Sequence, residues 1–259
     1  MKLFNTVCLI LALNLPSLAL ANPAFSVAPD RSYIDLNQPQ TYVFMVKNTG
    51  DQLIHVRITP AFLPVESNAL AAGKSLVSAK QQEATSLVPY TLISPQVLSL
   101  QPTEQRDVRV SIRVPDDLKP GTYREHLTVK MLEVARQINS AGNNSDVGIH
   151  LNLLMQIAPV IYGDKGSNEA MLSLRCQLNK DHQLTLEATN KTPWHFSGIL
   201  TGYGSDNTKP LFTQTITVFR NSERTVETNW KATTKTINLE WRNDHNPDAP
   251  VQKTPCNLK

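Results

Sequence analysis

Apolar and polar side chains alternate along residues 147–157. Every second residue there is apolar, which is the period of a β-strand, whose successive side chains point to opposite faces. A helix fits the stretch less well, because its apolar positions recur every three or four residues. The apolar members of the row are Val147, Ile149, Leu151, Leu153, Met155 and Ile157. So long a row indicates either a core strand of the protein itself or a strand that is buried by a partner.

Shorter runs with the same period lie on both sides of this row. They cover residues 41–48, 53–60, 106–115 and 123–132 before it, and residues 170–178, 183–190, 214–221, 224–230 and 235–241 after it. Glycine, asparagine, aspartate and proline separate the runs, as expected where a chain reverses direction. The pattern predicts an all-β protein built from antiparallel β-sandwiches.

Two segments do not follow the strand pattern. Residues 68–82 contain helix-forming residues, but Gly73 and two serines favour a loop with at most a turn or two of helix. Residues 139–148 are polar and rich in glycine and asparagine, which predicts a mobile loop.

The alternation stops near residues 162–169, where Gly163 and Gly166 occur, and a second set of strand-like runs follows. This break predicts two domains, residues 22–162 and residues 163–259, each within the usual size of a domain.

The first residues have the features of a secretory signal. Lys2 provides a positive charge, an apolar segment follows, and Ala19-Leu20-Ala21 is a small-x-small cleavage site. We therefore expect residues 1–21 to be removed on export. The apolar segment is too short for a transmembrane helix, and no other stretch of the chain is suited to membrane insertion.

Cysteine usage agrees with export to an oxidising compartment. Removal of residues 1–21 takes away Cys8 and leaves Cys176 and Cys256. The simplest expectation is one disulfide between them, with two free thiols as the alternative. A metal site is less expected, because the sequence has no CxxC motif and no closely spaced histidine and cysteine.

No motif for catalysis or nucleic-acid binding is present. The six histidines show no HxH or HExxH spacing, and neither a GxSxG motif nor a glycine-rich phosphate loop occurs. The formal net charge is +3, with basic residues scattered along the chain. The sequence thus predicts no enzyme, no cofactor, no metal and no nucleic-acid partner.

Three segments together carry a family likeness. They are "FSVAPDRSYIDLNQPQTYVFMVKNTGDQLIHVRITP", "LISPQVLSLQPTEQRDVRVSIRVPDDLKPGTYREHLTV" and "LLMQIAPVIYGDKG". In order and spacing they resemble the periplasmic pilus-assembly chaperones of the chaperone/usher pathway, nearest to its archaic and alternate branches. The resemblance implies two immunoglobulin-like β-sandwich domains in a boomerang arrangement. It also implies a periplasmic protein that binds pilus or fimbrial subunits and works with an outer-membrane usher.

The resemblance gives the long row a role. Chaperones of this family complete the open sandwich of a pilus subunit with a strand of their own, by β-strand addition. By this likeness Val147, Ile149, Leu151 and Leu153 would be the donated residues, while Met155 and Ile157 would belong to the core of the chaperone itself. The row serves a partner in this interpretation; an ordinary core strand is the alternative.

Family members also bind the terminal carboxylate of the subunit with basic residues in the cleft between their domains. Arg31 is the first candidate by its position on the opening strand, and Arg124 is the second. Arginine suits this role because its planar group can bind both carboxylate oxygens. The alternative for either is a solvated or structural arginine. The chain lacks the lysine that the best-known members carry on the last strand of the first domain, and the usual basic residue near Val160 is also missing.

Two other classes of function are alternatives. A structural or adhesive protein of the envelope would carry an alternating apolar extension at its mature N-terminus or a cluster of exposed aromatic residues. "NPAFSVAPD" is too short and polar for such an extension, and Trp194, Trp230 and Trp241 are spread over the second domain. A periplasmic hydrolase would require a catalytic constellation, and the sequence predicts none.

Overall fold

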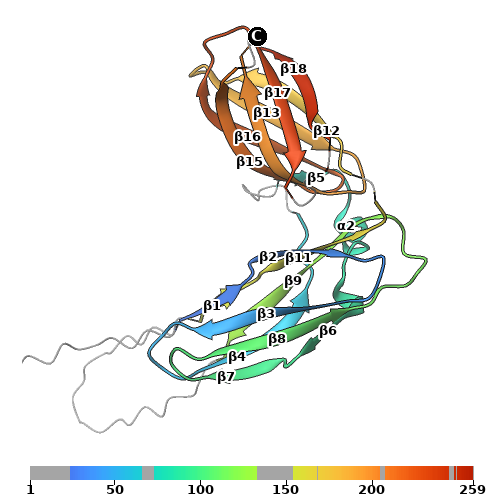
Figure 1. Cartoon of the computed structure of the whole chain (residues 1–259), viewed down its shortest axis with the longest axis vertical. Helices are drawn as coiled ribbons and strands as arrows, with labels where there is room; N and C mark the ends of the chain where they lie inside the picture. The colour runs from blue at the N-terminus through green and yellow to red at the C-terminus, as the bar shows by residue number, and fades with distance from the viewer. Residues whose placement is uncertain are drawn as a thin grey trace, which may run out of the picture.

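A computed structural model describes residues 24–65, 73–132, 154–167, 169–204, 208–244, 248 and 250–258. The expected signal segment 1–21, the polar loop 139–148 and the expected donor residues Val147, Ile149, Leu151 and Leu153 lie outside these ranges. Nearly all regular secondary structure of the described chain is β-strand, and the strands form two β-sandwiches set at an angle to each other (Figure 1). The prediction of an all-β protein with two sandwiches is confirmed.

The first sandwich packs two sheets face to face. One sheet has the order β1–β3–β8–β6, and the other has the order β2–β11–β9–β4–β7 with β10 also paired to β9. Their bounds are β1 Phe25–Ala28, β2 Arg31–Asp35, β3 Gln40–Asn48, β4 Ile54–Ala61, β6 Thr91–Ser94, β7 Val97–Leu100, β8 Gln105–Ile112, β9 Gly121–Met131, β10 Gln156–Ile157 and β11 Val160–Lys165. The one-turn 3₁₀ helix η2, Val88–Tyr90, precedes β6. Alternate side chains of both sheets, such as Phe44, Val56, Val110 and Val129, form the core.

The second sandwich has the sheets β12–β13–β16–β5 and β15–β14–β17–β18. Their bounds are β5 Lys74–Ser75, β12 Leu172–Leu178, β13 Gln183–Asn190, β14 Phe196–Tyr203, β15 Pro210–Val218, β16 Ser222–Lys231, β17 Thr236–Asn243 and β18 Gln252–Asn257. Cys176 on β12 and Cys256 on β18 form a disulfide with Cα atoms 6.1 Å apart, so it joins the two sheets of this sandwich.

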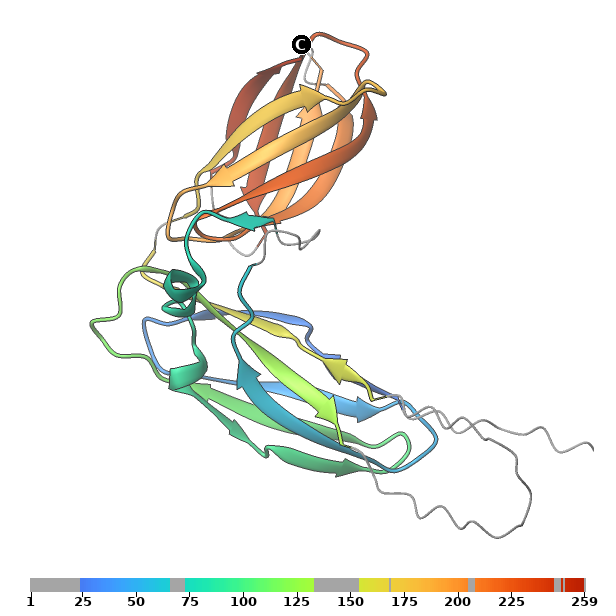
Figure 2. The same ribbon diagram turned by 180° about the vertical axis from the view of Figure 1, so that it is seen from behind.

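Residues 73–87, which we call the strap, connect the two sandwiches (Figure 2). β5 pairs with β16 of the second sandwich, with Ser75 opposite Ser222. The strap then forms the short helix α2, Ala79–Glu83, which begins with a capping box: Ser78 Oγ accepts from the Gln81 amide and the Gln81 side chain accepts from the Ser78 amide. The expectation of a loop with at most a turn or two of helix agrees with this segment.

Strand pairing in the first sandwich runs past the expected domain boundary. β11 continues to Lys165, which lies opposite Gly121 of β9. β5 comes from the first half of the chain and yet extends a sheet of the second sandwich. The position of the domain boundary after Tyr162 stays a prediction.

Candidate functional site

One face of the sheet β2–β11–β9–β4 points away from the core of the first sandwich and towards the second one. On this face Val160 of β11 lies opposite Arg31 of β2 and opposite His126 of β9. In the next row Tyr162 lies opposite Tyr33 and Arg124. The pairing of β11 with both β2 and β9 thus brings the two arginines that the sequence singled out onto one face, in neighbouring rows.

Arg31 is exposed and lies at the junction of the sandwiches. Its guanidinium donates a hydrogen bond to Ser197 Oγ of β14 at 3.1 Å, and Ser197 Oγ donates to Asp244 Oδ2 at 3.3 Å. Burial by itself would lower the pKa of Arg31, but the hydrogen bond and charge of Tyr33, followed by the charges of Tyr162 and Asp244, outweigh it and raise this pKa. Arg31 is therefore an exposed cation at the junction of the two sandwiches.

Arg124 has a different environment. Its side chain is only 9% exposed and donates to the Leu63 carbonyl oxygen at 2.7 Å. The guanidinium lies over the ring of Phe62 at 4.9 Å and over that of Phe219 at 4.6 Å, and its burial lowers its pKa. These contacts across the two sandwiches are typical of a structural arginine.

Three rings stack beside Arg31 at the junction. Tyr162 and His195 have ring centroids 4.2 Å apart, and Tyr33 lies 5.4 Å from Tyr162 and 5.5 Å from His195. His195 comes from the second sandwich, where its backbone amide donates to Thr122 Oγ1 at 3.0 Å. Sequence reasoning missed this stack, because no periodicity or motif links His195 to the strands of the first sandwich.

His126 adds no charge to the site near neutral pH. Burial, together with the nearby charge of Arg124, lowers its pKa to about 4. The apolar Val160 stands between His126 and Arg31 in the register. The strand β11 therefore lacks the basic residue that the family resemblance implies near position 160, since residues 160–162 are Val, Ile and Tyr.

The short strand β10 continues the sheet beyond β11. It pairs with β9 on one side, with Gln156 opposite Lys130 and Ile157 opposite Val129. Among the described residues no strand pairs with its other side. Met155 and Ile157 pack against the core of the first sandwich, which confirms the prediction that they belong to the protein's own core. The edge beside them can accept another strand.

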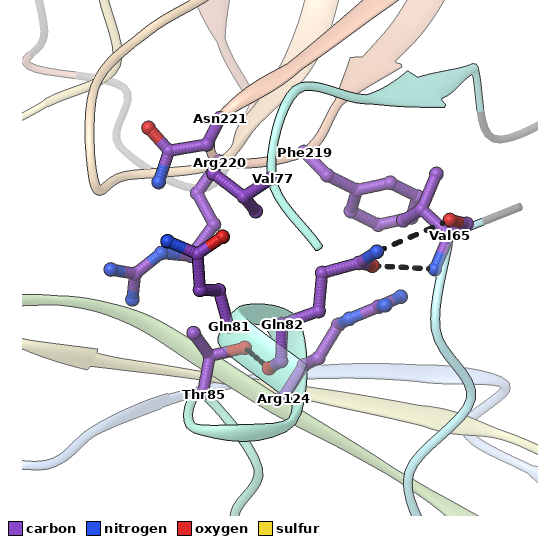
Figure 3. A pocket seen from close by; sticks show the side chains of 9 residues that line it. All are labelled: Val65, Val77, Gln81, Gln82, Thr85, Arg124, Phe219, Arg220 and Asn221. Atoms are coloured by element: carbon purple, nitrogen blue, oxygen red, sulfur yellow. Dashed lines mark hydrogen bonds between the residues drawn. The ribbon is translucent and has the colours of Figure 1, made fainter. Parts of the chain in front are cut away.

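A cavity of about 160 Å³ lies between α2, β9 and the turn that joins β15 to β16 (Figure 3). Gln81, Gln82 and Phe219 line it, together with Arg124 and Arg220. The two guanidinium groups point to opposite sides of the cavity, and that of Arg220 donates to the Thr122 carbonyl oxygen at 2.9 Å. Because the two cations do not converge, the cavity does not form an anion site.

The described ranges contain neither a metal-binding cluster nor a helix suited to a membrane. They contain no group of three or more histidine, cysteine, aspartate or glutamate side chains arranged to hold a metal ion. None of the helices in this part of the chain has the length and apolar character needed to cross a membrane.

Comparisons with known proteins give structural but not sequence matches. No protein-family model and no curated protein matches the chain. The chaperone–tip adhesin complex of CFA/I fimbriae biogenesis is similar with a TM-score of 0.49 and 9% identity, over 90% of this chain and 98% of that one. The E. coli chaperone DraB gives 0.49 and 11% over 92% and 97%, and the Salmonella enterica SafA pilin–SafB chaperone complex gives 0.48 and 12% over 89% and 95%.

Proposed function

We propose that this protein is a periplasmic chaperone that binds fimbrial subunits by donating a strand, stabilises them and delivers them to an outer-membrane usher. The observation that carries the proposal is the unpaired side of β10, at the end of the alternating row. Residues 1–21 would direct export to the periplasm.

The parity of the row supports the donor role. Met155 and Ile157 point into the core of the first sandwich. Val147, Ile149, Leu151 and Leu153 occupy positions of the same parity, so a strand of constant alternation would place them on the core side. There they would extend the apolar core of the chaperone into the open groove of a subunit.

The expected energy is sufficient for such a complex. Burial of an aliphatic side chain contributes about 1.5 to 3 kcal/mol, so four of them contribute roughly 6 to 12 kcal/mol before the costs of ordering. Main-chain hydrogen bonds along the free edge of β10 would add to this burial.

The donor role can be tested by co-expressing the chain with candidate subunits in a periplasm and measuring how much subunit co-purifies. Ile149→Asp combined with Leu151→Asp should reduce recovery more than about a hundred-fold, because it removes about 3 kcal/mol or more of apolar burial and places charges in the groove. The matched control is His150→Asp with Asn152→Asp, at the opposite parity of the row. Equal recovery with all three chains would refute donation.

Arg31 is our proposed anchor for the terminal carboxylate of the subunit, and Arg124 is the second candidate. The exposure of Arg31 and its raised pKa support this order, as do the aromatic contacts that hold Arg124. Arg31→Ala should weaken subunit binding roughly 10- to 100-fold, the value of a charge-assisted hydrogen bond. The control is Arg109→Ala, an exposed position of β8 on the opposite sheet. If only Arg124→Ala weakens binding, the order of the two anchors is wrong.

A further inference from the structure

Two basic residues lie directly opposite each other on the outward face of the first sandwich. Arg57 of β4 pairs with Lys130 of β9, and both are exposed. Like charges in directly opposite cross-strand positions destabilise a sheet. None of the ion pairs found among the described residues involves either side chain. The pair therefore has an electrostatic cost that no described carboxylate offsets.

The described residues in this row and in the next two rows towards the junction include no acidic side chain. The row continues to Val97 on one side and to Gln156 on the other. The neighbouring rows towards the junction hold Thr59 and Thr128, then Ala61, His126, Val160 and Arg31. Among the described residues on and beside these strands, acidic side chains occur at Asp30, next to Arg31, and where Asp35 pairs with Asp164. Cations thus occupy two of these three rows, with the uncharged Thr59 and Thr128 between them.

Exposed apolar side chains flank the pair. Val97 is 49% exposed, and Leu154, next to the core-facing Met155, is 44% exposed. A surface that combines two cations with apolar neighbours is suited to a protein partner. It is poorly suited to a phosphate backbone, which is bound by longer arrays of cations.

We infer that Arg57 and Lys130 bind an acidic surface of the polypeptide whose strand adds to β10, an inference that rests on the proposed function. Gln156 of β10 lies beside Lys130 in the same row. Neighbouring strands are about 4.8 Å apart, so a strand added to β10 would lie roughly 10 Å from β9. A lysine side chain spans most of this distance, and an acidic residue of the added strand in this row can meet Lys130. Arg57 then faces the adjoining surface of the same partner.

The test measures binding of a co-purifying subunit to the full chain at low and at high salt. Arg57→Glu combined with Lys130→Glu should weaken binding at least about tenfold at low salt and flatten its salt dependence. The matched control changes Lys47 of β3 and Arg109 of β8 to glutamate. Both are exposed residues on the opposite sheet, and this change should leave binding unchanged. A basic substitution at the acidic residue of the subunit should restore its binding to the variant that carries Arg57→Glu and Lys130→Glu.

The same experiment separates this inference from the proposed function. If the subunit binds the parent chain and not the Ile149→Asp, Leu151→Asp variant, while reversal of Arg57 and Lys130 has no effect beyond the control, only the inference is overturned. It is also overturned if the reversal abolishes binding to anionic vesicles or to heparin and leaves subunit binding intact. Lys130→Gln should weaken subunit binding with an unchanged or higher thermal midpoint of the free protein; a lower midpoint would assign Lys130 to the fold and overturn the inference.

Discussion

At the scale of single residues, Glu125 is the least expected side chain of the first sandwich. It lies on β9 between the core residues Tyr123 and Leu127, and it is fully buried. Neither carboxylate oxygen has a hydrogen-bond partner of normal geometry among the described residues. Burial raises its pKa to about 7, against a smaller lowering by Thr91. A carboxyl group at this position opposes folding whenever it is ionised.

This burial predicts that the free energy of unfolding depends on pH through Glu125. Below its ordinary pKa of 4.5 the group is protonated in both states and costs nothing. As the pH rises from 4.5 to about 7 the unfolded chain ionises first, so stability falls, by roughly 3 kcal/mol in total, and is then constant. Glu125→Gln should remove this loss, so that the variant is more stable than the parent at pH 8 and similar to it at pH 4.

Denaturant unfolding of both chains between pH 4 and pH 8 measures this difference. The buried His126 acts in the opposite direction, because its pKa of about 4 makes the folded state lose stability as the pH falls below 6.5. Its contribution is present in both chains and cancels when the two curves are subtracted. A parent and a variant that differ by the same amount at every pH would show that folding does not raise the pKa of Glu125.

At the scale of elements, the alternation of the sequence was sufficient for the long strands β3, β4, β8 and β9, whose ends lie within three residues of the predicted runs. It missed β14, Phe196–Tyr203, because Gly198 and Gly202 weaken the strand pattern. A Cβ atom at Gly198 would overlap the carbonyl group of Arg242 on β17, so the close approach of these strands requires glycine. A single sequence does not reveal such an approach.

The candidate site was predictable only where it depended on order along the chain. Arg31 and Arg124 could be named because each lies at a fixed place in a strand-like run. The stack with His195 could not, because it depends on the angle between two sandwiches whose strands are far apart in sequence. The two β5 residues, Lys74 and Ser75, are equally invisible, since a pairing this short has no periodicity.

At the scale of the whole molecule, the strap connects the sandwiches in addition to the segment between β11 and β12. The Leu76 amide donates to the Asn221 carbonyl oxygen at 2.8 Å, and Lys74 forms a 3.5 Å ion pair with Glu223. At its other end the Leu87 amide donates to the Arg124 carbonyl oxygen at 3.1 Å. The strap thus holds both sandwiches together and covers the edge of β16.

Gly73 controls how closely the strap can approach β16. Its φ is +84°, a conformation that favours glycine, and an added Cβ atom would overlap the carbonyl oxygen of Glu223. We expect Gly73→Val to detach β5, because the strain of about 1 to 3 kcal/mol is comparable to the energy of so short a pairing. Trypsin should then cleave after Lys74 or Lys80 about ten times faster or more, as mass spectrometry of timed digests would measure. Lys74→Ala removes the ion pair and keeps the backbone pairing, so its cleavage after Lys80 should stay close to that of the parent. Equal cleavage after Lys80 in all three chains would show that β5 does not hold the strap.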